Sequence, residues 1–114
     1  MAPSFAVDRD GLALAIGAAG GTRLRTALVL VASAVLDQGL EPQAAVDRPR
    51  FHPVARLLHA EPGVPEAALA ELEAHGWTIR VWPGRHHYFG GVSVIARSGA
   101  AGDPRRSGAA RAVG

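Results

Sequence analysis

The glycine pair Gly20-Gly21 is the feature of this sequence that best fits chemistry. It lies between an apolar run at 12–16 and a longer apolar stretch that begins at Leu24 with helical spacing. Consecutive glycines let the backbone approach a ligand closely, and the first turn of a helix has unpaired N–H groups. Such donors can stabilise a bound anion or the oxyanion of an acyl-transfer reaction. A strand-to-helix turn can also need glycine only for steric reasons, so the pair alone leaves both interpretations open.

The other polar residues give weaker signals for a metal site or a catalytic role. His86 and His87 are adjacent, so on a strand they would point to opposite faces, and no third residue stands at metal-ligand spacing. A solvated loop without a metal is predicted there. His52 is interpreted as a packing or hydrogen-bonding residue rather than a general base, because no serine-nucleophile motif accompanies it. Asp47 and Arg50 are predicted to form a capping or surface ion pair.

The composition narrows the class of protein. The chain has 114 residues, 48% of them hydrophobic, which is enough for one small domain with a core. The net charge is only +2, and no arginine run is interleaved with aromatic residues, so nucleic-acid binding is not predicted. Arg105-Arg106 is interpreted as a solvated end. The chain has no cysteine, and the glycine spacing is not that of a dinucleotide site, so no disulfide, thiolate metal site or cofactor is predicted.

The apolar run at 27–36 is the segment that most resembles a targeting signal. About twenty residues, several of them charged, precede it, whereas a secretory signal begins near the start of a chain. The run is also about half the length that spans a bilayer. A buried helix is therefore predicted in preference to a signal peptide, and no membrane span is predicted.

The order of elements predicts an α+β fold. Strands are predicted at 4–7, 12–16, 57–60, 77–82 and 92–96, and helices at 22–38, 43–47 and 65–75. Gly39 should end the first helix in the left-handed conformation, and Gly76 should close the last helix. The first helix should be buried nearly all round, yet a few short strands cannot cover it, so part of a larger body is predicted to be missing. From residue 98 onward a loosely held tail is expected.

Several short segments, taken in order, resemble the γ-glutamyltransferase family. Residues 1–24 are similar to the family segment that runs from Met-Ser-Pro to Gly-Ser-Pro-Gly-Gly-Ser-Arg. Residues 44–52, Ala-Ala-Val-Asp-Arg-Pro-Arg-Phe-His, are similar to the family's Ala-Val-Asp-Ala-Pro-Arg-Phe-His. The similarity continues through Glu61-Pro62-Gly63, the helix end at His75-Gly76, the pair Gly90-Gly91 and the closing Asp103-Pro104-Arg105-Arg106. The combination covers nearly the whole chain.

This resemblance implies an incomplete N-terminal-nucleophile hydrolase with a four-layer αββα core of antiparallel strands and buried helices. Residues 1–97 would be the C-terminal portion of the small-subunit fold, and 98–114 a tail rich in Gly, Ala and Arg. Enzymes of this family cleave themselves into a large and a small subunit, and the new N-terminal Thr attacks the γ-glutamyl carbonyl of glutathione or related amides. By resemblance, Gly20 and Gly21 would donate backbone N–H groups to the oxyanion. The resemblance also suggests that the complete enzyme is periplasmic or secreted, whereas the chain itself does not indicate a localisation.

The departures from the family pattern limit what this chain can do. The family's nucleophile, its serine pair and a large-subunit Arg that hold the substrate carboxylate all lie outside the matched segment, and Ala18-Ala19 replaces Ser-Pro. The only threonines here are Thr22, Thr26 and Thr78. The chain alone is therefore predicted to be inactive, with the large subunit and the N-terminal part of the small subunit as partners. The alternatives are a stand-alone, non-enzymatic module that binds a partner or small anion, or a fragment of a related acylase.

Overall fold

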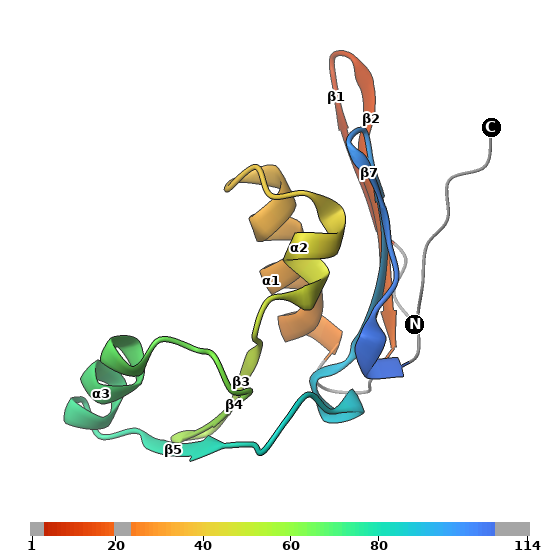
Figure 1. The fold of residues 1–114 in the computed structure, drawn as a ribbon. Helices are drawn as coiled ribbons and strands as arrows, with labels where there is room; N and C mark the ends of the chain where they lie inside the picture. The colour runs from red at the N-terminus through yellow and green to blue at the C-terminus, as the bar shows by residue number, and fades with distance from the viewer. Residues whose placement is uncertain (1–3, 20–23, 107–114) are drawn as a thin grey trace.

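The computed structural model describes residues 4–19 and 24–106, which form two β-sheets with helices packed on them (Figure 1). The four-stranded antiparallel sheet has the order β1-β2-β6-β7, made of β1 (Ser4–Asp8), β2 (Gly11–Ala19), β6 (Gly91–Ala96) and β7 (Gly99–Ala101). The three-stranded sheet contains β3 (Phe51–Val54), β4 (Leu57–Ala60) and β5 (Thr78–Val81). The helices are α1 (Leu24–Leu36), α2 (Pro42–Asp47) and α3 (Glu66–Ala74), with short 3-10 turns η2 (His87–Phe89) and η3 (Pro104–Arg106).

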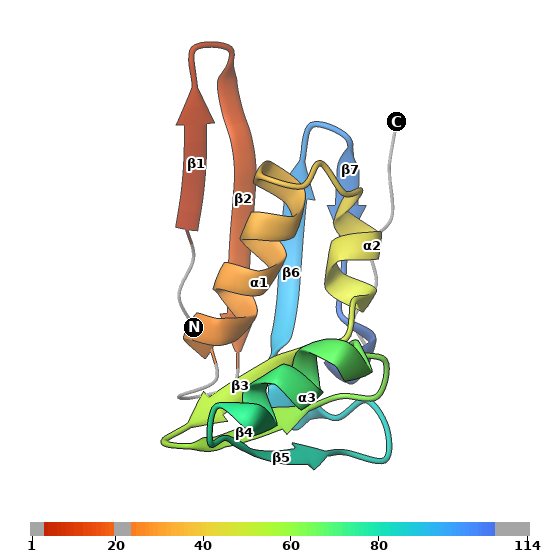
Figure 2. The same ribbon diagram turned by 90° about the vertical axis from the view of Figure 1, so that its left-hand side faces the viewer.

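Helices α1 and α2 cover one face of the four-stranded sheet (Figures 1 and 2). Alternate residues of the central strands point toward them, because successive side chains of a strand lie on opposite faces. On the helix side, Ala27 and Ala34 are small enough to let α1 approach the sheet closely. The resulting core joins Leu14, Ile16, Ala18, Ala27, Val31, Ala34, Ala45, Val46, Val92, Val94 and Ala101.

The opposite face of this sheet carries apolar side chains that no helix of the described residues covers. Phe5, Ala15 and Ile95 lie directly across from one another on three neighbouring strands. Phe5 is 73% exposed and Ile95 is 60% exposed. On α1, Val29 is 66% exposed, so the prediction of a helix buried nearly all round is wrong for this chain. The prediction rested on apolar side chains around the whole helix, but the described residues cover only the side that faces the sheet.

Two glycines end the longer helices as the sequence predicted. Gly39 has φ +69°, and the N–H of Leu40 donates to the carbonyl of Ala34 at 3.0 Å. Gly76 has φ +92° and is followed by a bond from Trp77 N–H to the carbonyl of Leu72 at 3.1 Å. Such left-handed ends satisfy the last carbonyls of a helix, and glycine adopts them without strain.

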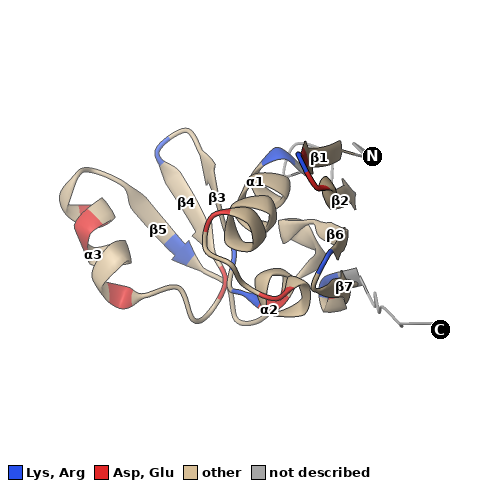
Figure 3. Cartoon of the chain, turned by 90° about the horizontal axis from the view of Figure 1, so that it is seen from above, with Lys and Arg blue, Asp and Glu red and all other residues tan. Residues whose placement is uncertain are grey.

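In Figure 3 the second sheet and α3 lie on the opposite side of the view from β1. The acidic residues of α3 are exposed. Strands β4 and β5 pair in parallel and are joined through α3, whereas β3 pairs antiparallel to β4. Leu58, Ala60 and Leu69 form its small core. Strand β3 was not predicted, because Pro53 cannot donate to a ladder. As an edge strand, β3 tolerates it.

Residues 99–106 depart from the expectation of a loosely held tail, and the rest of the predicted tail lies outside the described residues. Residues 99–101 form β7, which pairs with β6 so that Ile95 lies opposite Ala100. Asp103 is 2% exposed and Arg105 is 8% exposed. The expectation failed because the Gly/Ala-rich composition gives no local signal for an edge strand, and because two charged side chains are buried by partners distant in sequence.

Candidate active-site turn and its supporting contacts

The predicted oxyanion residues Gly20 and Gly21 lie outside the described residues, which stop at Ala19 and resume at Leu24. The elements on either side are described. Strand β2 is an interior strand of its sheet, and Ala19 at its end pairs with Gly91 at the start of β6. Helix α1 begins after only four residues and packs back on the same sheet (Figure 2). A strand therefore ends just before the predicted position, and a helix begins just after it.

The first turn of α1 is bonded to the second sheet. Thr26 Oγ1 lies 2.8 Å from His52 Nδ1, a hydrogen bond in which either atom can donate, depending on the tautomer of the imidazole. His52 lies on β3 and is 9% exposed. The predicted hydrogen-bonding role of His52 is thus confirmed.

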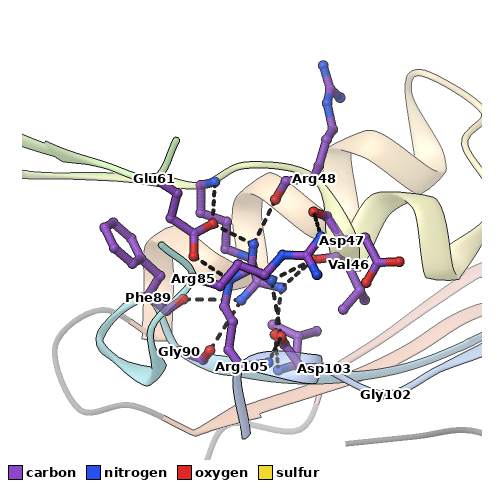
Figure 4. Close-up of polar contacts among 12 residues, drawn as sticks. Val46, Asp47, Arg48, Glu61, Arg85, Phe89, Gly90, Gly102, Asp103 and Arg105 are labelled. Atoms are coloured by element: carbon purple, nitrogen blue, oxygen red, sulfur yellow. Dashed lines mark hydrogen bonds and ion pairs between the residues drawn. The ribbon is translucent and has the colours of Figure 1, made fainter. Parts of the chain in front are cut away.

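A buried cluster of four charged residues lies where the segment after α2, the segment after β4 and the region of η3 meet (Figure 4). We call it the ion cluster; it consists of Arg50, Glu61, Asp103 and Arg105. Asp103 bridges the two arginines, at 2.7 Å from Arg50 Nη2 and 3.0 Å from Arg105 Nη1. Arg105 Nε also donates to Glu61 Oε2 at 2.7 Å. Two positive and two negative charges balance, as burial of ionised groups requires.

The ion cluster also binds the backbone of several elements. Arg105 donates to the carbonyls of Val46 and Arg48, at 2.7 and 2.9 Å, at the end of α2. Arg50 donates to the carbonyls of Phe89 and Gly90, at 3.1 and 3.3 Å, in and after η2. On the carboxylate side, Asp103 accepts from Val92 N–H at 3.0 Å, and Glu61 accepts from Arg50 N–H at 2.8 Å. Within the described residues, Arg50 Nε is the one buried side-chain nitrogen or oxygen without a hydrogen-bond partner.

The pKa values of the two arginines are shifted in opposite directions. Burial lowers the pKa of Arg50 from its ordinary value, and the positive charge of Arg105 lowers it further, against the attraction of Asp103 and Glu61. Burial also acts to lower the pKa of Arg105, but its bonds to Glu61 and Asp103 outweigh burial and raise that pKa. Because a guanidinium stays charged in proteins, both residues remain cations and depend on the carboxylates.

Two interpretations of charged residues from the sequence are wrong. Arg50 does not pair with Asp47 but with Asp103, 53 residues farther along. The Asp47 side chain instead accepts from Gln43 at 2.9 Å. Arg105 is not a solvated end, since its side chain is 0% exposed. The sequence signal that could have found the cluster was the family-like Pro-Arg-Phe-His, Glu-Pro-Gly and Asp-Pro-Arg segments, whose charged members meet here.

Histidine and aromatic rings gather near η2. Trp82 stacks on Tyr88 with ring centroids 4.9 Å apart, and Trp82 Nε1 donates to His59 Nδ1 at 3.2 Å. Burial lowers the pKa of His59, and the charge of Arg80 lowers it further. His86 Nδ1 accepts from Tyr88 N–H at 3.0 Å. In the part of the chain that the structure describes, no three His, Cys, Asp or Glu residues are grouped to hold a metal ion, and no helix is long and apolar enough to cross a membrane.

The fold of this chain is similar to segments of several solved enzyme structures. A mutant γ-glutamyltranspeptidase of Helicobacter pylori is 28% identical, with a TM-score of 0.77 over 92% of this chain and 60% of that chain. The Pseudomonas nitroreducens γ-glutamyltranspeptidase complexed with L-DON is 27% identical, with a TM-score of 0.74 over 100% of this chain and 60% of that chain. A cephalosporin acylase from Bacillus halodurans is 28% identical, with a TM-score of 0.86 over 98% of this chain and 22% of that chain.

The α+β architecture with its four-stranded antiparallel sheet is therefore that of the N-terminal-nucleophile hydrolases. The sequence model of the family described as Gamma-glutamyltranspeptidase matches residues 1–113. This chain belongs to the γ-glutamyltranspeptidase family, as its resemblance indicated. It spans 60% of the length of the solved γ-glutamyltranspeptidase chains given above.

Proposed function

We propose that this chain is the C-terminal segment of a γ-glutamyltransferase small subunit, which transfers or hydrolyses γ-glutamyl groups of glutathione-like amides. Its contribution is a pair of backbone N–H donors at Gly20 and Gly21, which receive the negative oxygen of the tetrahedral intermediate. The observation that carries the proposal is that β2 ends just before that pair and α1 begins soon after it, in a chain that belongs to this family.

The surroundings of the turn support this role. An oxyanion hole works when its donors are fixed before the reaction, in a site shielded from water. Strand β2 is bonded to a strand on each side, and its last residue, Ala19, is paired with Gly91. On the other side of the turn, Thr26 is bonded to His52. Both ends of the turn are therefore held by the fold.

The catalytic nucleophile is proposed to come from the rest of the polypeptide. The chain would be completed by the large subunit and the N-terminal part of the small subunit. The other sheet of the αββα core, which these parts would supply, would cover the row formed by Phe5, Ala15 and Ile95. The exposure of Phe5 and Ile95 supports this arrangement, because monomeric proteins rarely leave contiguous apolar surfaces uncovered. Without the nucleophile, the oxyanion donors have no covalent step to accelerate, so the chain alone is expected to be inactive.

A related amide acylase is the second candidate. The match to the Bacillus halodurans cephalosporin acylase has a TM-score of 0.86, so the same fold segment also occurs in an enzyme named for another amide substrate. The residues that would grip the substrate's α-carboxylate in a γ-glutamyltransferase lie outside this chain. The two candidates therefore share the proposed oxyanion turn and differ in the substrate.

The test is to produce the chain together with the part of a γ-glutamyltransferase that the chain does not contain, and to assay a γ-glutamyl anilide and a glutaryl anilide. The second substrate lacks the α-amino group. We expect turnover of the first by the reconstituted protein and none by either part alone. Gly21→Pro, which removes one N–H donor, should lower kcat at least about 100-fold, whereas Gly84→Ala in a distant turn should not.

Each other outcome has a defined meaning. Turnover only when the chain is combined with the corresponding part of a cephalosporin acylase, and not with that of a γ-glutamyltransferase, would favour the acylase. Turnover by the chain alone would contradict the missing-nucleophile argument. Full activity of a folded Gly21→Pro protein would contradict the oxyanion role.

A further inference from the structure

A groove lies between the outer side of α1 and the segments that follow α2 and β4. Its volume is about 440 Å³, which is within the range of sites that bind small molecules. Phe51 is 37% exposed and Val29 is 66% exposed, so much of its apolar lining is open to water. The apolar side chains that line the groove are Val29, Leu30, Pro49, Phe51, Val64 and Pro65.

Contacts within the described residues fix the walls of the groove. Gly63 approaches Pro49 so closely that a Cβ atom on it would lie 2.8 Å from Pro49 Cγ. Arg50, which also lines the groove, is held by its 2.7 Å pair with Asp103 in the ion cluster. A groove whose walls are already in place binds a ligand at a lower cost in conformational entropy.

The groove has one cation whose charge no carboxylate offsets. Arg48 is exposed and lines the groove, and it makes no ion pair within the described residues. Its Nη1 donates to Gln38 Oε1 at 2.6 Å, an uncharged partner that also lines the groove. Figure 4 shows the Arg48 side chain directed away from the ion cluster. No Asp or Glu is among the described residues that line the groove, so its charge complements that of an anion.

We propose that this groove binds a small apolar carboxylate. The apolar body of the ligand packs against Val29, Leu30 and Val64, and its carboxylate pairs with Arg48. A guanidinium presents parallel N–H donors that match the two oxygens of a carboxylate. The backbone of Arg48 is fixed, because its carbonyl accepts from Arg105 Nη2 at 2.9 Å. The groove is formed by residues between 29 and 65, so binding there does not depend on the proposed acyl-transfer function.

The test is a titration of the full chain, with methyl groups labelled for NMR, with 3-phenylpropanoate. The uncharged 3-phenylpropanamide has the same apolar body and is the matched ligand. We expect the methyl signals of Val29, Leu30 and Val64 to shift, and those of the core residue Val94 to stay in place. The acid should bind at least about tenfold more tightly than the amide, because only the acid forms a charged pair with Arg48.

Two variants test the role of the arginine. Arg48→Gln should weaken binding of the acid about tenfold and leave binding of the amide unchanged. Arg9→Gln removes the same charge in the turn between β1 and β2, and should change neither affinity. Equal affinities for the acid and the amide in the parent would overturn the proposal. So would an unchanged affinity of Arg48→Gln for the acid, or methyl shifts confined to residues outside the groove.

The same titration of the reconstituted protein distinguishes a ligand site from an interface. Retained binding of 3-phenylpropanoate would support the ligand site. Binding by the chain alone that is lost on reconstitution would show that the remaining polypeptide fills the groove, and would overturn the ligand site.

Discussion

At the scale of single residues, the ion cluster explains why the segments around Arg50, Glu61 and 103–105 must come together in the folded chain. Arg50, Glu61, Asp103 and Arg105 are each nearly inaccessible to water. A buried charge is tolerated only when it is paired and hydrogen-bonded. The cluster therefore specifies where the chain after β7 must lie, although buried ion pairs contribute little net stability compared with apolar packing.

Asp103→Asn should be strongly destabilising. It leaves Arg50 and Arg105 with one carboxylate between them, so an uncompensated positive charge stays buried. Breaking a buried pair in this way costs about 3–5 kcal/mol, a large share of the stability of a small domain. The measurement is the unfolding midpoint in urea.

Asp8→Asn provides the control for Asp103→Asn. Asp8 pairs with Arg97 at 2.7 Å, but both side chains are nearly half exposed. Its substitution should leave the midpoint almost unchanged. Equal shifts for the two substitutions would contradict the importance of burial.

The protein should lose stability as the pH falls below about 6.5, in part through His59. Burial and the charge of Arg80 lower the pKa of His59, so the unfolded chain binds a proton more readily than the folded one. The stabilisation is complete above the ordinary pKa and is lost as the pH falls toward the lowered value. Protonation of Nδ1 also removes the bond from Trp82.

The pH effect is measured as the urea midpoint at pH 7.5 and pH 5.5, in the parent and in His59→Gln. The charged or titratable groups of the described residues that face His59 include Arg80 and His52 on the neighbouring strands, and Tyr88, whose ring centroid lies 5.0 Å from that of His59. His59→Gln keeps these neighbours and removes one titrating group, so the difference between the two midpoints should become smaller. An unchanged difference would show that other groups carry the pH dependence.

At the scale of elements, α1 should be sensitive to substitution on one side only. Val31 is 1% exposed and belongs to the core, whereas Val29 on the same helix is 66% exposed. Val31→Ala should cost about 2 kcal/mol, because it leaves a cavity against the sheet. Val29→Ala in the isolated chain should change stability by less than about 0.5 kcal/mol. The free energy of unfolding of both variants checks this, and similar losses would mean that α1 is covered on both sides.

Elements with a local signal were the ones predictable from sequence. The β1–β2 hairpin, the helix ends at Gly39 and Gly76, and strand β4 follow from turn residues and apolar spacing, which act over a few residues. Strands β3 and β7 were missed, since one contains Pro53 and the other is three small residues whose pairing is set by β6. The ion cluster was missed for the same reason. Its ion pairs Arg50–Asp103 and Arg105–Glu61 join residues 53 and 44 positions apart, and no local pattern encodes them.

At the scale of the whole molecule, the two faces of the four-stranded sheet have different roles. One face holds the core with α1 and α2, and the other presents the row that contains Phe5, Ala15 and Ile95. The prediction that part of a larger body is missing agrees with a chain that spans 60% of the solved γ-glutamyltranspeptidase chains it matches. Exposed in the isolated chain, this apolar row should promote self-association, whereas buried in a complete enzyme it should stabilise the packing of the two sheets.

Ile95→Thr tests both effects of the apolar row. In the isolated chain, the substitution should reduce self-association and binding of a hydrophobic dye, because it removes apolar surface that water contacts. In the reconstituted enzyme, the sheet supplied by the remaining polypeptide is proposed to bury the row. There the same change should lower the free energy of unfolding by about 1–2 kcal/mol, since a buried hydroxyl without a partner replaces a packed side chain. Ser93→Thr, on the same face of β6, removes no apolar surface and is the matched control. If Ile95→Thr had no effect on the reconstituted enzyme, this face of the sheet would not be where the remaining polypeptide packs.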